Sequence, residues 1–298
     1  MRRLVPALVA GALVSASLAG CSNDDATSAG TAVATSTSST STSTIPPTTS
    51  TSTTSTSTST TTSTSTSTTS TTTPLPYPDF LGEEVVGTSI QGRPMNAMHR
   101  GTPGGVVILV VGVIHGDEDA GMGVVEALRT APLPPGIDLW LLDAMNPDGW
   151  ANQERGNANG VDLNRNFPHD WTAIAQPGEW EYSGTGPASE PETQAFIAFA
   201  ERIKPELTLW YHQDLWRLSP STGRDGPLRQ RYSEVSGLPI EPVTGGTYTG
   251  VAATWVRRTV PDAMSFIIEL GETLPGDELP KHVAAVLSVA EMVRDGEV

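Results

Sequence analysis

Four short apolar runs constrain the fold of this 298-residue chain more than any other feature. They read GVVILVVGVI, IDLWLLD, ELTLWYH and MSFIIEL. Short runs rich in β-branched and aromatic residues predict buried strands. Helical patterns alternate with them over residues 118–130, 190–204, 228–236 and 280–294, and Ser189 with Glu192 predicts a capping box in the second. The alternation predicts an α/β fold: a mixed, largely parallel twisted sheet with helices on both faces.

The first 21 residues have the pattern of an export signal. A charged start, Met1-Arg2-Arg3, precedes an apolar stretch, and Leu18-Ala19-Gly20-Cys21 is similar to the bacterial lipoprotein box. We therefore expect a signal peptide over residues 1–20 and lipidation of Cys21, the only cysteine. The alternative is an ordinary secretory signal with an incidental cysteine. The lipoprotein interpretation places the protein on the outer face of the bacterial cytoplasmic membrane.

Residues 21–78 are rich in serine and threonine and lack apolar periodicity. Such a segment cannot bury enough apolar surface to order itself, so it predicts a disordered tether that lets the domain reach into the cell wall. The formal net charge of −16 argues against nucleic acid or an anionic lipid surface as partner. We expect membrane contact only through Cys21, and a monomer.

Two of the five histidines directly end predicted strands. His115 follows the first run and is followed by Glu118, and His212 ends the third run. In open α/β sheets, ligands bind beyond the carboxyl ends of the strands, where Glu269 would also lie. Two histidines and a carboxylate are a ligand set that zinc hydrolases use, with one position left for water. The alternative is that these strand-end histidines are only hydrogen-bonded.

A second polar cluster, NPDGWANQERGNANGVDLNRNFP, covers residues 146–168 between a strand and the next helix. It predicts a long loop without regular structure of its own. Such a loop is either solvated and held by Asx turns or functional.

The order of five motifs resembles that of the zinc metallocarboxypeptidase family. These are HGDE, NPDG, GVDLNRNFP, YHQ and FIIELGE, and the match is closer to the bacterial murein peptide amidase branch. GTSIQGRPMNAMHRG at residues 87–101 and GPASEPETQAF at residues 186–196 are also similar to that branch. The resemblance implies a zinc carboxypeptidase-like domain over residues 79–298. It also implies a metallopeptidase that hydrolyses peptide or γ-glutamyl amide bonds in peptidoglycan stem peptides.

Carried over motif by motif, the resemblance implies a Zn²⁺ ion bound by His115, Glu118 and His212. Glu269 would be the general base and acid, because a carboxylate beside polarised water can take its proton and pass it to the leaving amine.

Four further residues receive roles from the same resemblance. Arg155 would stabilise the developing oxyanion, and Asn164 with Arg165 would bind the substrate's terminal carboxylate. A salt bridge that fixes the loop is the alternative for Arg165. Tyr248 would contact the substrate, although its spacing to Trp255 is shorter than in digestive members.

Other functions remain open from the sequence. An aspartoacylase-like zinc deacylase of N-acyl amino acids also combines a His-x-x-Glu motif with an Asn-Arg motif. A non-catalytic wall-binding lipoprotein is the third possibility. Asp214 and Arg217, which follow His212, could recognise a zwitterionic group or could be solvated loop charges.

Overall fold

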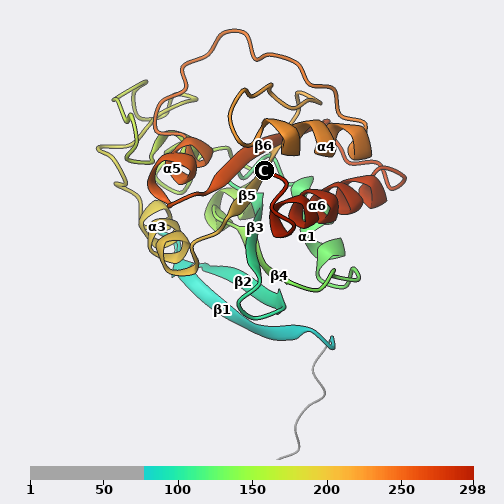
Figure 1. The fold of residues 1–298 in the computed structure, drawn as a ribbon. Coiled ribbons are helices and arrows are strands. Elements are labelled where there is room, and N and C mark those ends of the chain that lie inside the picture. Colours follow the sequence, from blue (N-terminus) through green and yellow to red (C-terminus); the bar gives the residue numbers. More distant parts are fainter. Residues whose placement is uncertain (1–76) are drawn as a thin grey trace, which may run out of the picture. The chain divides into compact units, whose positions relative to one another are not determined.

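The computed structural model describes residues 77–298, so the predicted signal peptide, Cys21 and the tether up to residue 76 lie outside the described residues. The described part is built on a six-stranded sheet with strand order β1-β2-β4-β3-β5-β6 (Figure 1). The strands are β1 Phe80–Thr88, β2 Pro94–Gly101, β3 Val106–Val113, β4 Ile137–Ala144, β5 Leu207–Gln213 and β6 Met264–Leu270.

The four apolar runs form the parallel part of the sheet, in the order β4-β3-β5-β6. The hairpin of β1 and β2 adds an antiparallel edge next to β4. Sequence reasoning missed this hairpin. Strand β1, FLGEEVVGT, mixes charged residues with half-buried ones, because it lies at the edge and packs only one face.

Helices cover both faces of the sheet, so the predicted fold class is confirmed. Helices α1 Gly121–Leu128, α4 Gly226–Ser236 and α6 Leu279–Arg294 share one hydrophobic core with the sheet. Helices α3 Pro191–Ile203 and α5 Ala252–Thr259 form a second core against its other face. Figure 1 shows the two helical layers on opposite sides of the strands.

Two local predictions were wrong. The segment 146–168 is not irregular throughout, because it contains the short helix α2 Pro147–Asn152 and the 3-10 turn η1 Leu163–Arg165. The capping box at α3 is also absent: Glu190 is the N-cap residue and makes no side-chain cap bond. Glu192 instead accepts hydrogen bonds from the Ile90 backbone N–H and from Asn157. A tertiary contact has replaced the local one.

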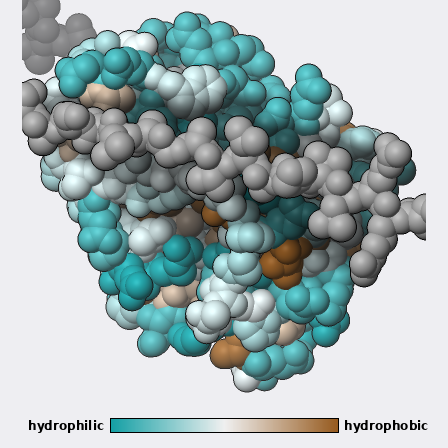
Figure 2. All heavy atoms as spheres, turned by 90° about the horizontal axis from the view of Figure 1, so that it is seen from above, coloured by the Kyte–Doolittle hydropathy of each residue, from teal (hydrophilic) through white to brown (hydrophobic). Residues whose placement is uncertain are grey.

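The surface that Figure 2 draws is mainly hydrophilic, and its hydrophobic residues are scattered. Large exposed hydrophobic side chains of the described residues include Trp180 and Tyr248, which both belong to the site described below. Within residues 77–298, no helix is both long and apolar enough to span a bilayer.

Candidate active site and metal centre

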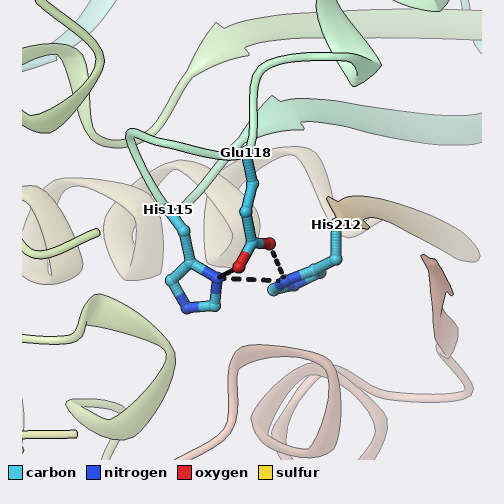
Figure 3. A group of neighbouring side chains, drawn as sticks. All are labelled: His115, Glu118 and His212. Atoms are coloured by element: carbon cyan, nitrogen blue, oxygen red, sulfur yellow. Dashed lines mark hydrogen bonds and ion pairs between the residues drawn. The ribbon is translucent and has the colours of Figure 1, made fainter. Parts of the chain in front are cut away.

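The structure brings the three predicted metal ligands together at the carboxyl edge of the sheet. His115 follows β3 and Glu118 lies on the turn into α1, while His212 is near the end of the neighbouring parallel strand β5. Figure 3 shows the side chains of His115 and Glu118 extending from one loop toward His212. The three offer ligand atoms that all lie within 4.8 Å of one another.

The donor atoms of this group fit a zinc ion. His115 Nδ1 lies 3.1 Å from His212 Nδ1 and 2.8 Å from Glu118 Oε1, and His212 Nδ1 lies 2.9 Å from Glu118 Oε2. Lone pairs of two imidazoles and a carboxylate repel one another at these distances unless a positive charge lies among them. Two imidazole nitrogens with a carboxylate oxygen are a zinc-binding set found in hydrolases.

Asp162 fixes the orientation of His115. The carboxylate lies 3.0 Å from His115 Nε2, which leaves Nδ1 directed at the other two ligands. This is the carboxylate–histidine–metal arrangement that orients a ligand and raises its basicity. Sequence reasoning did not single out Asp162, although it lies within the quoted motif GVDLNRNFP.

The charges of the group are strongly coupled. Burial alone would lower the pKa of His115, but the carboxylates of Asp162 and Glu118 raise it to about 9. Burial alone would raise the pKa of Glu118, but His115 and His212 hold it far below its usual range. Both shifts have one consequence: the two carboxylates stay ionised and attract a cation to the position between the ligands.

Two glycines allow the loops that carry the site to touch. A Cβ atom on Gly116 would lie 1.9 Å from the carbonyl carbon of Gly149, so only glycine fits at this crossing of the HGDE and NPDG motifs. Asn146 caps α2 by accepting the Gly149 N–H, and its amide donates to the Arg155 carbonyl. The glycine contact and the cap together place Arg155 beside the ligands.

The motif at residues 87–101, which resembles the murein branch, supports the NPDG loop through hydrogen bonds to Asp148. Asp148 is buried and accepts hydrogen bonds from the Ser89 hydroxyl at 2.7 Å, the Gln91 N–H at 2.9 Å and the Arg93 guanidinium at 2.7 Å. These contacts hold the pKa of Asp148 below its ordinary value against the effect of burial. The β1–β2 turn is therefore a support for the NPDG loop.

Arg155 reaches the metal ligands directly. Its Nη1 lies 2.8 Å from Glu118 Oε1 and 3.1 Å from His115 Nδ1, and its Nε and Nη2 donate to Asp162. The indole ring of Trp180 covers the guanidinium, with 4.8 Å between Cζ and the ring centroid. The cation lies where an oxyanion stabiliser is needed, and that role remains a prediction.

The Asn164–Arg165 pair is close to the site but already engaged. Asn164 Oδ1 accepts the Ala252 backbone N–H at the start of α5. Arg165 Nη2 donates to Glu181 Oε1 at 2.5 Å, while its buried Nε has no hydrogen-bond partner among the described residues. The ion pair is of the kind expected if Arg165 fixes a loop, and the free Nε leaves capacity to bind a substrate carboxylate.

Tyr248 lies next to this pair. Its ring centroid is 5.5 Å from Arg165 Cζ, and the side chain is 59% exposed, so the ring can move without disturbing the core. Gly250 supports the same loop: its φ is +59°, and a Cβ there would lie 2.2 Å from the Arg165 carbonyl oxygen. Substrate contact by Tyr248 stays a prediction.

Glu269 lies directly beside His212, because the two residues are partners in the β5–β6 ladder. Burial and the nearby Glu118 carboxylate raise the pKa of Glu269 to about 7. Its Oε2 is buried and has no partner within the described residues, so it is free to accept a proton. Arg217 pairs with Glu269 through backbone hydrogen bonds of 3.0 and 3.1 Å and thereby helps to position it.

Comparisons with known proteins agree with this geometry. The zinc carboxypeptidase family profile matches residues 71–215. Murein peptide amidase A of Escherichia coli strain K12 is 30% identical over 187 residues, which cover 58% of this chain and 76% of that protein.

Solved structures agree as well. The crystal structure of murein-tripeptide amidase from Escherichia coli O157 matches with a TM-score of 0.58 and 25% identity, over 70% of this chain and 91% of that one. Carboxypeptidase A of Helicoverpa armigera has the same fold, with a TM-score of 0.64 at 16% identity, over 74% of this chain and 69% of that one. The family is zinc-dependent and hydrolytic, which confirms the predicted cofactor and enzyme class. The chain belongs to the zinc carboxypeptidase family.

Proposed function

We propose that this enzyme hydrolyses peptide or γ-glutamyl amide bonds in peptidoglycan stem peptides. One observation carries the proposal: His115, Glu118 and His212 converge beside Glu269 on a fold similar to that of murein-tripeptide amidase. The similarity to murein peptide amidase A supports the substrate class. The β1–β2 turn, from the motif that resembles the murein branch, supports it further by bracing the catalytic loop.

Glu269 performs the proton transfers in the proposed mechanism. Zinc bound by the His–Glu–His group supplies Lewis acidity, which polarises a peptide carbonyl and makes water a stronger acid. Glu269 takes a proton from the attacking water as the oxygen–carbon bond forms. It returns that proton to the leaving nitrogen as the carbon–nitrogen bond breaks, so the carboxylate is regenerated.

Arg155 and Arg165 position and stabilise the substrate. Arg155 offers a fixed cation beside the ligands, where negative charge develops on the carbonyl oxygen. Arg165 offers a guanidinium that can bind both oxygens of a terminal carboxylate once Glu181 is displaced. An enzyme with this clamp removes or releases a C-terminal residue.

Location is part of the same proposal. Lipidation of Cys21 would hold the enzyme on the outer face of the cytoplasmic membrane, and the Ser/Thr-rich residues that follow would give it reach into the wall. Changing Cys21 to Ser should release the protein or leave its precursor unprocessed. Unchanged membrane fractionation and unchanged mature mass would refute the anchor.

The decisive test uses defined muropeptides. Purified enzyme is incubated with a panel of stem peptides, and the products are identified by mass. Glu269→Gln should lower kcat by about 10²–10⁴-fold with zinc content unchanged, since only the proton acceptor is lost. If wild-type enzyme with full zinc cleaves N-acyl amino acids but no stem peptide, the deacylase interpretation replaces this one.

The carboxylate clamp needs a separate measurement. Arg165→Ala should raise KM for peptides with a free C-terminal carboxylate and leave their C-terminally amidated counterparts nearly unaffected. Equal losses on acid and amide peptides would indicate an endopeptidase.

A further inference from the structure

The guanidinium of Arg155 is held along one edge, but by a single oxygen atom. Its Nε and Nη2 both donate to Asp162 Oδ2, at 3.0 and 2.8 Å. The other oxygen, Asp162 Oδ1, lies 3.0 Å from His115 Nε2 and accepts the Asn164 N–H at 2.8 Å. An arginine fork that meets two oxygens is held in the plane of the carboxylate, whereas a fork on one oxygen can pivot about it. Asp162 therefore fixes the place of the guanidinium but not its tilt.

The remaining nitrogen of Arg155 does not fix the tilt either. Its Nη1 lies 2.8 Å from Glu118 Oε1 and 3.1 Å from His115 Nδ1, and both atoms belong to the metal ligands. An imidazole nitrogen has one lone pair, so Nδ1 cannot bind zinc and accept from Nη1 at the same time. These contacts therefore weaken in the zinc enzyme, where Nη1 has to face the substrate.

The indole ring of Trp180 supplies the restraint that the hydrogen bonds lack. Arg155 Cζ lies over this ring, 4.8 Å from its centroid. An aromatic ring against the flat face of a guanidinium opposes tilting, and the attraction between the cation and the ring holds the two together. The ring also keeps water away, since the side chain of Arg155 is only 12% exposed although it follows the exposed Glu154.

Asp162 also fixes the loop that carries the indole. Its backbone N–H donates to the Tyr182 carbonyl at 2.8 Å, two residues after Trp180. The next residue, Ser183, is fully buried, and its hydroxyl bonds to backbone atoms of the same loop. Asp162 thus holds the guanidinium through its side chain and the loop of the indole through its main chain. One residue sets both sides of the stacked contact.

We propose that Trp180 is a positioning residue for the reaction: it holds Nη1 of Arg155 toward the carbonyl oxygen of the scissile bond and shields the guanidinium from water. A cation that is fixed and shielded stabilises developing negative charge better than one that tilts or is hydrated. The inference rests on the proposed function, in which Arg155 stabilises the oxyanion. Because the oxyanion forms only in the transition state, Trp180 acts on kcat more than on KM.

Substitutions at Trp180 test this role without disturbing the core. The side chain is 67% exposed and belongs to neither hydrophobic core, so its variants should fold. Trp180→Ala should lower kcat on a stem peptide by about 2- to 30-fold, the range that corresponds to a cation–π contact, with KM and zinc content nearly unchanged. Gln176→Ala is the matched control, because it removes an exposed side chain of the same loop, and its kcat should equal that of wild type.

Two conservative variants identify the property of the ring that matters. Trp180→Phe keeps an aromatic face and should restore most of kcat. Trp180→Leu keeps apolar bulk without that face and should remain as slow as Trp180→Ala. An unchanged kcat in folded Trp180→Ala, or equal rescue by leucine and phenylalanine, would overturn the inference.

A double-mutant cycle with Arg155 separates positioning from direct contact with the substrate. Arg155→Ala alone should lower kcat, and Trp180→Ala added to it should cause no further loss, because the indole acts only through the guanidinium. Arg155→Lys, which keeps a cation without the planar face, replaces Arg155→Ala in the cycle if the latter loses zinc. Additive losses would show that Trp180 contacts the substrate by itself, and the inference would then be wrong.

Failure of the proposed function is distinguishable from failure of this inference. A wild-type enzyme that cleaves no stem peptide would refute the proposed function, and the same cycle on the amide that the enzyme does cleave would still decide the role of Trp180. An Arg155→Ala enzyme with wild-type kcat would remove the oxyanion role of Arg155 and this inference with it, while cleavage of stem peptides would stand.

Discussion

Arg165 and Glu181 form an ion pair, with 2.5 Å between Nη2 and Oε1, at the position where the substrate's terminal carboxylate is expected to bind. The neighbouring Trp180 lies on Arg155, so two consecutive side chains of one surface loop cover both arginines of the site. The carboxylate of Glu181 thus offers Arg165 the same chemistry as a substrate terminus. A substrate that binds there must first displace it.

Glu181→Gln should therefore improve binding of substrates with a free carboxylate. Partly exposed ion pairs contribute up to about 1 kcal/mol, so KM should fall by about fivefold while kcat stays nearly constant. Glu179→Gln is the control, because Glu179 lies in the same loop and is exposed, and its carboxylate accepts a hydrogen bond only from the Gln176 N–H. An unchanged or higher KM in Glu181→Gln would mean that Glu181 supports the clamp instead of competing with the substrate.

The second prediction concerns the support of the metal ligand His115. Asp162→Asn keeps the size of the side chain but weakens the bond to His115 Nε2, which is 3.0 Å long. Loss of such a supporting carboxylate should weaken zinc affinity by about 10- to 100-fold. Competition with a chelator of known affinity measures the change. Asp143→Asn, which removes a carboxylate outside the site, should leave the affinity of the enzyme for zinc at the wild-type value.

The third prediction tests the crossing of the two loops. Gly116→Ala places a Cβ atom 1.9 Å from the Gly149 carbonyl carbon, so the HGDE and NPDG loops must separate. Overpacking of this kind lowers the free energy of unfolding by about 1–3 kcal/mol. Zinc content should fall because the ligands His115 and Glu118, which flank Gly116, move away from His212. Gly123→Ala is the control in α1, where the nearest atom would be 3.7 Å away. It should be neutral or slightly stabilising. Equal behaviour of the two variants would contradict the packing argument.

Much of the site was predictable because strand ends converge in a parallel sheet. His115, His212 and Glu269 each follow or end an apolar run, and these runs became the adjacent strands β3, β5 and β6. Placing the three side chains at one edge required no knowledge of loops.

Other features depended on contacts that no local pattern encodes. Glu181 meets Arg165 across an irregular loop of the surface, and Arg257 of α5 reaches the Ser265 carbonyl only because α5 packs against β6. The predicted capping box at Ser189 is absent for a related reason. Glu192 is buried and accepts hydrogen bonds from Asn157 and from the Ile90 N–H in the β1–β2 turn. At Glu192 a tertiary contact therefore overrode the local propensity.

The last prediction concerns a buried titratable group outside the site. His282 on α6 is fully buried, and its Nδ1 lies 2.9 Å from the hydroxyl of Tyr232 on α4, which in turn lies 2.9 Å from the hydroxyl of Tyr211. Its Nε2 has no hydrogen-bond partner among the described residues. Burial, and to a smaller extent the charge of Lys281, lowers the pKa of His282 to about 4.

The sign of the pH dependence follows from that shift. The unfolded chain binds a proton to this histidine below about pH 6.5, whereas the folded chain does so only below about pH 4, so acid favours unfolding. This contribution is fully present above pH 6.5 and is lost as the pH falls to about 4, by on the order of 3 kcal/mol. His282→Gln removes the titration and can still accept a hydrogen bond from Tyr232. The unfolding free energy of wild type minus that of His282→Gln, measured by denaturant titration, should therefore decrease steadily from pH 7 to pH 4. A difference that stays constant across this range would show that His282 is protonated in the folded protein as readily as in the unfolded chain.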